Sequence, residues 1–427
     1  MVYRERRLRR EDILIDGERI ITVGAGLPNY SVDRVISCPN CLIVPGFVDV
    51  HTHLRVPGFF YKETAATATL AAARGGFTTV CAMPNVNPVP DSAEHIRVSR
   101  ETIDKDAIVN VKLVGAITKG ERGEELSDMD AIAGDVVGFS DDGHGVQSDE
   151  LMRQAMLAAK RHGKSIMAHT EDNRLRGAGV IHQGEYAARH GIPGIPAAAE
   201  WRQVERDLNL VHETGARYHV QHVSCKETVE LIRKAKAQGT PVTCETAPHY
   251  LALSEDDLLD DGRFLMNPPL RSAEDRQALI CGLADGTIDI IATDHAPHTD
   301  QEKSKGLRGS AMGIVGLETA FSVVYTKLML TGKVPLERIL SAMCDEPRKL
   351  IGELSAIRPN ASADLTIIET ETPIPINAKK FASKGHSSPF DGWAVRGQVL
   401  MTMVNGRITH EADALGAYSQ YAAVGAK

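Results

Sequence analysis

Short apolar runs alternate with Ala-rich or charged stretches of helical character across the middle of the chain, from about residue 45 to about residue 350. This alternation is typical of a parallel sheet in which each strand is followed by a helix. The strand candidates are residues 47–54, 78–85, 109–117, 136–142, 165–170, 217–223, 241–247 and 288–294, and the helical stretches include residues 63–74, 149–161, 200–213 and 227–237. Eight such strands close a barrel, so the pattern predicts an α/β protein with a (β/α)8 TIM-barrel fold.

The two ends of the chain have a different pattern, with short apolar runs on either side of tight turns. Asp16-Gly17 lies between residues 13–15 and 19–23, and Asn405-Gly406 lies between residues 400–404 and 407–410. Asp-Gly and Asn-Gly pairs favour two-residue hairpin turns. We therefore predict a small discontinuous β-domain, made of residues 1–46 and 355–427, attached to a barrel domain of residues 47–354.

Composition and charge exclude several classes of protein. The 427 residues include 48 Lys and Arg against 56 Asp and Glu, a net charge of −8, so no basic field is available to attract nucleic acid. The charged N-terminus lacks the apolar stretch of a secretory signal, and no segment has the roughly eighteen apolar residues that a membrane span needs. Seven scattered cysteines do not suggest a disulfide framework. We expect a cytoplasmic protein without membrane or nucleic-acid partners.

Histidines recur at the predicted carboxyl ends of the strands. His51 and His53 end the first strand candidate, and side chains two residues apart on a strand point the same way. His169, His222 and Asp294 lie at the ends of three further strand candidates. Barrel enzymes place their sites at this end, and imidazole together with carboxylate suits zinc or a similar divalent ion. The pattern therefore predicts a metal site.

Strand alternation also distinguishes neighbouring candidates. His219 and His222 are three residues apart and are expected to face opposite sides, so we predict that only His222, nearer the strand end, reaches the barrel interior. By the same rule, Asp294 is assigned to the metal and His295 to a supporting role. For the adjacent pair Asp141-Asp142, alternation alone does not decide which side chain points inward.

Several motifs together resemble those of class I dihydroorotases. They are His51-Thr52-His53-Leu54-Arg55, Met83-Pro84-Asn85, Asp141-Asp142-Gly143, Met266-Asn267-Pro268-Pro269-Leu270 and Ala292-Thr293-Asp294-His295-Ala296-Pro297-His298. The resemblance spans nearly the whole chain, and the last motif is the most specific because it combines a metal ligand with a second histidine that the family uses for substrate. It implies an enzyme that interconverts dihydroorotate and N-carbamoyl-aspartate in pyrimidine synthesis.

Carried over position by position, the resemblance implies roles for individual residues. The metal ligands would be His51, His53, Asp142, His169, His222 and Asp294, and they would hold one or two Zn²⁺ ions per subunit. The substrate carboxylate would be bound by Arg55, Asn85 and His298, with Asn267 lining the pocket. Asp294 would also act as the catalytic base and then the acid. Val56 and Val86 replace the Glu and Thr that are usual in the family, which bears on local packing and affinity.

Two other functions compete with this interpretation. A hydantoinase or allantoinase shares the fold and the reaction type but bridges its metals through a carboxylated lysine on the fourth strand. Residues 136–143 contain no Lys. An uncharged hydantoin also offers no carboxylate for Arg55 to bind. A non-catalytic dihydroorotase-like subunit of aspartate carbamoyltransferase would lack ligands that are all present here.

The sequence leaves other properties open. A homodimer and an association with aspartate carbamoyltransferase are both compatible with the resemblance. Residues 299–313 are polar and punctuated by glycine, and they are predicted to form either a lid over the site or an ordinary surface loop.

Overall fold

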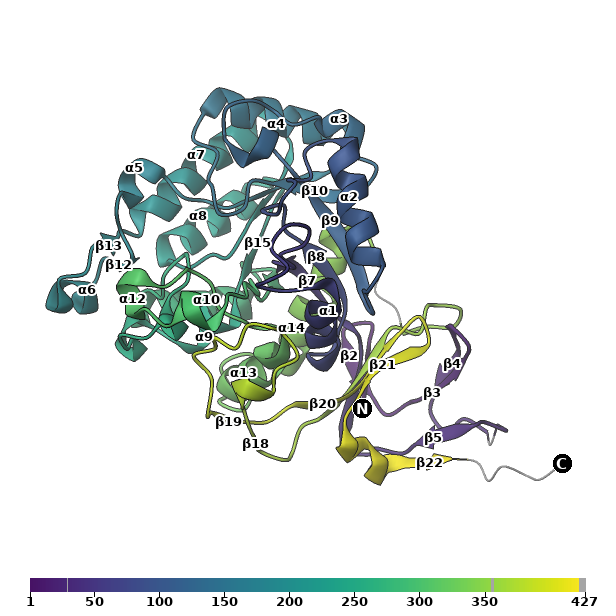
Figure 1. The fold of residues 1–427 in the computed structure, drawn as a ribbon. Coiled ribbons are helices and arrows are strands. Elements are labelled where there is room, and N and C mark those ends of the chain that lie inside the picture. The colour runs from purple at the N-terminus through teal and green to yellow at the C-terminus, as the bar shows by residue number, and fades with distance from the viewer. Residues whose placement is uncertain (29, 355–356, 422–427) are drawn as a thin grey trace.

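The computed structural model describes residues 1–28, 30–354 and 357–421, and its central feature is an eight-stranded parallel sheet (Figure 1). In sheet order, the strands are β7 (Phe47–Thr52), β8 (Phe77–Ala82), β9 (Asn110–Ala116), β10 (Val136–Ser140), β11 (Ser165–Ala168), β14 (Arg217–Val220), β15 (Val242–Thr246) and β16 (Ile290–Ile291). Every neighbouring pair in this order is parallel.

The first and last strands of the sheet come together and close it. Thr52, at the end of β7, forms a parallel bridge with His295, and the backbone N–H of His53 donates to the carbonyl oxygen of His295 at 2.8 Å. The predicted (β/α)8 TIM barrel is thus confirmed. The eighth strand is shorter than expected, because β16 ends at Ile291 and the following residues turn toward the site.

Helices surround the barrel and follow its strands. The longer ones are α1 (Ala65–Arg74), α2 (Ala93–Asp104), α4 (Asp149–Arg161), α7 (Ala198–Thr214), α8 (Lys226–Ala237) and α10 (Ala273–Asp285). The shorter ones are α3 (Met129–Ile132), α5 (Asn173–Arg176), α6 (Glu185–His190), α9 (Pro248–Ala252), α11 (Asp300–Lys303), α12 (Gly306–Gly309), α13 (Ala320–Val324), α14 (Leu336–Leu340) and α15 (Glu346–Leu350). None of the helices in the described part of the chain is long and apolar enough to cross a membrane.

Side-chain caps explain where several of the longer helices begin. Thr64, Ser92, Ser148 and Ser272 each accept a hydrogen bond from the backbone N–H of the third helical residue, which satisfies a donor that has no partner within the helix. In α1 the buried face consists mainly of alanines, and these small side chains let the helix pack closely on the barrel.

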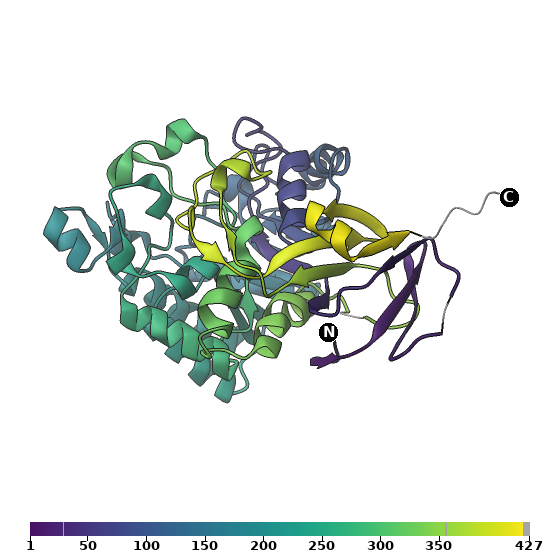
Figure 2. The ribbon, with the colours of Figure 1, turned by 90° about the horizontal axis from the view of Figure 1, so that it is seen from below.

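A second sheet combines strands from both ends of the chain, which lie side by side in both views (Figures 1 and 2). Its order is β2 (Arg7–Arg9), β1 (Val2–Arg4), β6 (Cys41–Pro45), β17 (Leu365–Glu369), β20 (Gln398–Val404) and β21 (Arg407–Glu411). The smaller pairs are β3 (Asp12–Asp16) with β4 (Arg19–Gly24), β5 (Arg34–Ile36) with β22 (Ser419–Tyr421), β12 (Ile181–His182) with β13 (Gly194–Ile195), and β18 (Ile374–Pro375) with β19 (Ala394–Val395).

The two predicted turns each connect a pair of these strands, and one of them is shifted by one residue. Asn405 and Gly406 join β20 to β21, and both have positive φ angles of 48° and 74°, as a two-residue hairpin turn with this sequence requires. Between β3 and β4 the turn is formed by Gly17 and Glu18, because Asp16 still pairs with Arg19.

Two hydrogen bonds connect the second sheet to the barrel at the end of α1. The Thr366 hydroxyl donates to the carbonyl oxygen of Gly76 at 2.8 Å, and the Thr402 hydroxyl donates to that of Ala73 at 2.6 Å. Gly76 has a φ of +87°, and a Cβ atom there would lie 2.9 Å from Thr366 Cγ2 and 3.0 Å from Phe47 Cδ2. Glycine is therefore needed for the close approach of sheet and barrel.

Candidate active site

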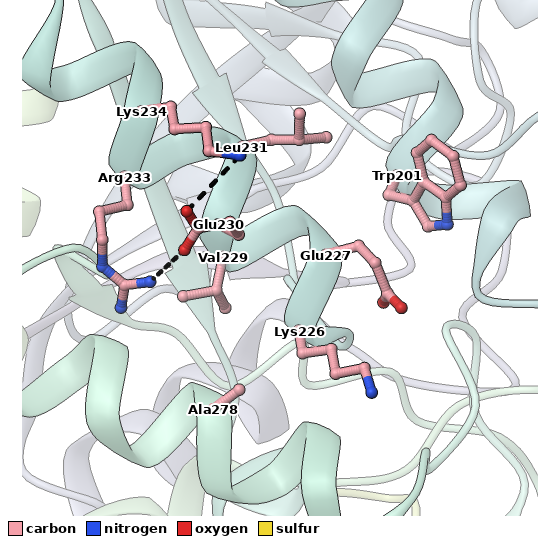
Figure 3. Close-up of a pocket in the computed structure, with 9 residues that line it drawn as sticks. All are labelled: Trp201, Lys226, Glu227, Val229, Glu230, Leu231, Arg233, Lys234 and Ala278. Atoms are coloured by element: carbon pink, nitrogen blue, oxygen red, sulfur yellow. Dashed lines mark hydrogen bonds and ion pairs between the residues drawn. The ribbon is translucent and has the colours of Figure 1, made fainter.

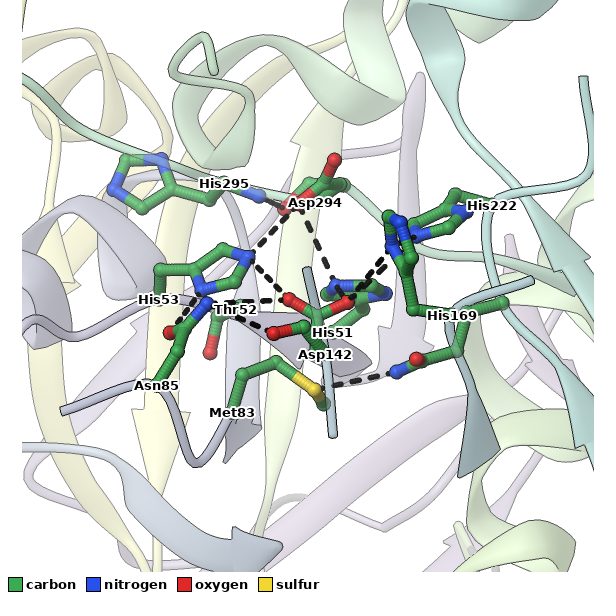
Figure 4. A network of polar contacts seen from close by, with 12 residues as sticks. His51, Thr52, His53, Met83, Asn85, Asp142, His169, His222, Asp294 and His295 are labelled. Carbon is green, nitrogen blue, oxygen red and sulfur yellow. Dashed lines mark hydrogen bonds and ion pairs between the residues drawn. The ribbon is translucent and has the colours of Figure 1, made fainter. Parts of the chain in front are cut away.

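His51, His53 and Asp142 form the centre of a buried polar cluster at the carboxyl ends of the barrel strands (Figure 4). Both histidines come from β7, and Asp142 follows β10. Asp142 Oδ1 lies 3.3 Å from His51 Nε2, and its Oδ2 lies 3.3 Å from His53 Nε2. Alternation along β7 thus points both imidazoles at one carboxylate, as expected for side chains two residues apart.

His169 and His222 complete the other side of this carboxylate. Asp142 Oδ1 lies 3.6 Å from His169 Nδ1 and 3.7 Å from His222 Nε2, and these two ring nitrogens are 2.8 Å apart. Asp142 therefore stands among four histidines.

Asp294 lies against the first pair of histidines. Its Oδ1 is 3.1 Å from His53 Nε2 and 3.5 Å from His51 Nε2. Asp294 has a φ of +48°, so the backbone leaves the strand direction there. All six residues predicted as metal ligands therefore lie together, while His295 points away from the cluster and accepts a hydrogen bond from the Gly316 backbone N–H.

The other member of the adjacent aspartate pair has a different place. Asp141 Oδ1 accepts hydrogen bonds from the backbone N–H groups of Ile117 and Thr118, at 2.8 and 3.0 Å. Asp141 thereby links the end of β10 to the loop after β9. Of the two adjacent aspartates, which strand alternation alone could not distinguish, only Asp142 belongs to the cluster.

The charges of the cluster favour a cation. Burial alone would lower the pKa of His51, but Asp142, Glu245 and Asp294 outweigh it and raise that pKa well above its usual value. Burial alone would raise the pKa of Asp142, but the neighbouring histidines hold it well below its usual range. His51 Nε2 and Asp142 Oδ1 are buried with no hydrogen-bond partner among the described residues. Nitrogen and carboxylate donors that face one another in this way suit a divalent metal ion.

Three of the ring nitrogens that face away from the cluster have an oxygen near them, whereas His222 Nδ1 has no partner among the described residues. His51 Nδ1 lies 2.6 Å from Glu245 Oε1, His53 Nδ1 lies 2.8 Å from Asn85 Oδ1, and His169 Nε2 lies 3.6 Å from Glu171 Oε2. Metal-binding histidines commonly donate their second N–H to such groups, which fixes the ring orientation and tautomer. Glu245 and Glu171 were not recognised from the sequence.

The expectation that His219 faces away from His222 was wrong. His219 Nε2 lies 2.9 Å from Glu245 Oε2, and the other oxygen of Glu245 contacts His51 Nδ1 and accepts from the His222 backbone N–H at 3.4 Å, so His219 and His222 meet the same buried carboxylate. The alternation rule fails because β14 ends at Val220 and His222 has a positive φ of 34°. The irregular backbone brings His222 round to the cluster.

Three of the four residues predicted to bind substrate lie together near the cluster: Arg55 contacts His298, and Asn85 contacts the cluster itself. Arg55 has a φ of +59°, its Nε donates to the carbonyl oxygen of Pro297 at 3.2 Å, and its Nη2 lies 3.2 Å from His298 Nε2. Asn85 contacts His53 through Oδ1, and its Nδ2 donates to Asp142 Oδ2 at 3.4 Å.

Asn267 is held by Glu171. Its Nδ2 donates to Glu171 Oε2 at 3.3 Å, and its Oδ1 is buried with no partner in the described part of the chain. A buried carbonyl oxygen of this kind can accept one further hydrogen bond.

Residues 299–313, for which a lid was one prediction, carry α11 and α12 and are held by a buried lysine. Lys303 is 7% exposed, and its Nζ donates to the carbonyl oxygens of Leu265, Ala311 and Gly313 at 3.0, 2.7 and 2.7 Å. The segment is therefore packed against the loop that precedes Asn267.

A groove on the outer helical layer contains none of the predicted site residues. It lies between α7, α8 and α10 and is lined by Trp201, Lys226, Glu227, Val229, Glu230, Leu231, Arg233, Lys234 and Ala278 (Figure 3). Glu230 pairs there with Arg233 and Lys234, an ordinary arrangement on an exposed helix.

Known proteins resemble this chain over almost its whole length. A family model described as Dihydro-orotase-like matches residues 40–228. A dihydroorotase of Fusobacterium nucleatum is 45% identical over 96% of this chain and 96% of its own, and one of Lactiplantibacillus plantarum is 47% identical over 96% of both chains. The chain belongs to the dihydroorotase family.

Solved structures with the same fold include related hydrolases. An L-hydantoinase (dihydropyrimidinase) from Arthrobacter aurescens superposes with a TM-score of 0.85 at 27% identity, covering 94% of this chain and 92% of its own. A dihydropyrimidinase from Brevibacillus agri, at 21% identity and a TM-score of 0.82, shares the fold over 94% of this chain and 91% of its own. Val56 and Val86, where the family usually has Glu and Thr, are both buried.

Proposed function

We propose that this chain is a dihydroorotase, a cyclic amidohydrolase that interconverts dihydroorotate and N-carbamoyl-aspartate in pyrimidine synthesis. The observation that carries the proposal is a buried guanidinium beside the His/Asp cluster: Arg55 is 9% exposed and lies next to His298. A planar guanidinium matches a carboxylate with two parallel hydrogen bonds. Dihydroorotate carries such a carboxylate on the ring whose amide is opened.

The proposed cofactor is zinc, one or two ions per subunit. The residues that would hold it are His51, His53, Asp142, His169, His222 and Asp294. The unpartnered His51 Nε2 and Asp142 Oδ1 support this fit. A metal ion bound there would polarise the amide carbonyl and lower the pKa of water from ~15.7 toward ~7, so that hydroxide is available near neutral pH.

Asp294 is proposed as the catalytic residue that carries the proton. One of its carboxylate oxygens faces His51 and His53, and the other points away from them (Figure 4). In hydrolysis, Asp294 takes the proton of the attacking water and delivers it to the ring nitrogen as the C–N bond breaks. In ring closure the same proton moves in the reverse direction.

The substrate would be oriented by Arg55, His298, Asn85 and Asn267. Arg55 and His298 are proposed to bind the carboxylate, together with the Asn85 amide, whose contacts to Asp142, at 3.4 and 3.5 Å, are long. Asn267 would accept a hydrogen bond from a substrate N–H through its free Oδ1. These contacts require an anionic substrate with N–H groups.

A direct comparison of substrates tests the proposal. We expect the purified protein to contain a divalent metal, identified and counted by anomalous scattering, and to hydrolyse dihydroorotate much faster than hydantoin. A protein that prefers hydantoin, or that is equally active after complete removal of metal, would contradict it.

The competing hydantoinase function predicts different chemistry at the metal bridge. A carboxylated lysine has to form from carbon dioxide, whereas residues 136–143 contain no lysine and Asp142 stands at the centre of the cluster. After chelation, we expect zinc to restore dihydroorotate hydrolysis equally in carbon-dioxide-free buffer with and without bicarbonate. Recovery that depends on bicarbonate would overturn the assignment of Asp142.

We further propose that the protein works in the cytoplasm on this small substrate, without nucleic-acid or membrane partners. Size-exclusion chromatography, alone and with aspartate carbamoyltransferase, tests the homodimer and the association that the family resemblance allows.

A further inference from the structure

Lys62 lies beside the proposed carboxylate site, in the loop between β7 and α1. Its side chain is 15% exposed, and its Nζ lies 6.0 Å from the ring centroid of Phe59 and 5.6 Å from that of Tyr61. The same Nζ lies 3.0 Å from Glu302 Oε1 and 3.2 Å from His298 Nδ1. The ammonium group is therefore held against one particular nitrogen of the His298 ring.

The surroundings of His298 favour the neutral ring. Burial, together with the positive charges of Arg55, Lys62 and Lys303, outweighs the opposing charge of Glu302 and lowers the pKa of His298 to about 3. A neutral imidazole carries one N–H, on either Nδ1 or Nε2, and the position of that proton decides which nitrogen can donate.

The neighbours of His298 select one of the two tautomers. An ammonium group only donates hydrogen bonds, so Nδ1 has to accept from Lys62, and the proton then resides on Nε2. From Nε2 it is donated to the carbonyl oxygen of Met312 at 2.8 Å. The opposite tautomer would satisfy only the Arg55 contact to Nε2, at 3.2 Å, and would set Nδ1–H against the ammonium and the Nε2 lone pair against the carbonyl.

Besides Arg55, a carboxylate favours the opposite tautomer. Glu302 Oε2 lies 3.6 Å from His298 Nδ1, beyond hydrogen-bond distance, and accepts instead from the backbone N–H and the hydroxyl of Thr299. If the ammonium of Lys62 were removed, the Glu302 carboxylate would become the strongest charge near Nδ1 and would attract the ring proton to that side.

We propose that Lys62 is a positioning residue that holds His298 as its Nε2–H tautomer, so that an N–H stands beside the Arg55 guanidinium where the substrate carboxylate binds. The inference rests on the proposed function, since it assigns His298 to that carboxylate. The arriving carboxylate takes the place of the Met312 carbonyl as acceptor. In the opposite tautomer, the Nε2 lone pair would repel the carboxylate.

Steady-state kinetics of Lys62→Met, which keeps the aliphatic stem, test the proposal. We expect KM for dihydroorotate to rise roughly ten- to a hundredfold, the effect of losing a charge-assisted hydrogen bond, with kcat and metal content nearly unchanged. Lys62→Arg keeps a donor and should recover most of the affinity. Lys384→Met is the matched control, because Lys384 is exposed and donates to the Phe60 carbonyl oxygen of the same loop without contacting His298.

A double-mutant cycle separates positioning from direct attraction of the substrate. If Lys62 acts through the imidazole, Lys62→Met has little further effect in a His298→Gln background. An effect of the same size in both backgrounds would overturn the proposal, because it would show that the ammonium attracts the carboxylate by itself.

The tautomer can also be measured without substrate. In ¹⁵N-histidine-labelled enzyme, with the His298 signals assigned by His298→Gln, we expect a protonated Nε2 in the unmodified chain and a shift of the proton toward Nδ1 in Lys62→Met. An unchanged tautomer in the variant would overturn the inference. This measurement stands even if the enzyme fails to hydrolyse dihydroorotate, an outcome that would instead count against the proposed function.

Discussion

Glu245 connects two histidines that are far apart in the sequence. One oxygen lies 2.6 Å from His51 Nδ1 and the other 2.9 Å from His219 Nε2, and all three side chains are buried. Burial alone would raise the pKa of Glu245, but His51 and His219 lower it. An ionised carboxylate in this place can accept from both rings, and it orients His51 with Nε2 toward the cluster.

Glu245→Gln should therefore weaken metal binding. The amide has only one oxygen, so it can accept from one histidine and presents N–H groups to the other. We expect the metal dissociation constant to rise roughly ten- to a hundredfold, as is usual when the partner of a metal-bound histidine is lost. Titration with a competing chelator measures it, and unchanged affinity would mean that Glu245 does not support the ligand.

Arg55→Lys should separate substrate binding from metal binding. The lysine keeps the charge but loses the planar fork, so one charge-assisted hydrogen bond of about 1.5–3 kcal/mol disappears. We expect KM for dihydroorotate to rise roughly tenfold or more at unchanged metal content. An unchanged KM would rule out the proposed carboxylate contact.

At the scale of residues, the sequence predicted groups that lie at strand ends but not the groups that support them. Strand alternation was enough to place His51 and His53 on one side of β7, whereas Asp142 was distinguished from Asp141 only by the family resemblance. Glu245, Glu171 and Lys62 act through pairings between distant segments, and no local pattern shows which carboxylate will face which ring. The error at His219 has the same origin, because strand alternation is informative only as far as the strand remains regular.

Among the elements, the segment of α11 and α12 depends on Lys303. Its three acceptors, the carbonyl oxygens of Leu265, Ala311 and Gly313, match the three donors of an ammonium group. Two of them flank Met312, whose carbonyl oxygen accepts from His298. The lysine thus ties the segment both to itself and to the loop before Asn267.

Lys303→Met should loosen this segment while leaving the barrel intact. The carbonyl groups of Ala311 and Gly313 lose this donor, at a cost of about 1–3 kcal/mol each where water does not replace it, while the Leu265 carbonyl still accepts from the Gly313 backbone N–H. We expect faster proteolysis and faster amide hydrogen exchange within residues 304–312. Lys305→Met, at an exposed position of the same segment, is the control and should behave like the unmodified chain. Equal protection in both variants would contradict a role for Lys303 in holding the segment.

Helices were predicted more accurately than the ends of strands, for a physical reason. The limits of α4 follow from the Ser148 cap and from periodicity, and those of α8 follow from periodicity alone, and both signals are local in sequence. β16 is shorter than its apolar run because residues 292–295 leave the sheet to bring Asp294 to the site and His295 to the bridge with Thr52. The turn between β3 and β4 is shifted by one residue because pairing in the strand, rather than the Asp-Gly pair, sets its position.

For the molecule as a whole, we expect the contact between the second sheet and the barrel to contribute to stability. Thr402 is fully buried, and its hydroxyl is the donor to the carbonyl oxygen of Ala73 at the end of α1. Thr402→Val keeps the shape but leaves that carbonyl without this partner, so we expect the free energy of unfolding to fall by about 1–2 kcal/mol.

Urea denaturation measures this change, with metal content and KM as checks that the site is unaffected. Thr409→Val is the control, because its half-buried hydroxyl donates to the Thr402 carbonyl oxygen within the sheet and does not reach the barrel. We expect it to cost less than about 0.5 kcal/mol. Equal losses in the two variants would mean that the contact between sheet and barrel does not add to stability.

The bridge between Thr52 and His295 joins two segments that are synthesised at very different times. At ~5–20 residues per second, roughly 12–50 s separate the synthesis of His53 from that of Asp294, against which it packs. The interval between the synthesis of β6 and that of β17, its partner in the second sheet, is longer still. A nascent chain therefore carries the first histidines long before the remaining proposed ligands exist, and an ion captured early would be held by only part of the proposed set. Under the proposed function, complete metal loading would follow synthesis of the whole barrel, and premature termination anywhere before residue 294 would leave a chain without a closed barrel or the full set of proposed ligands.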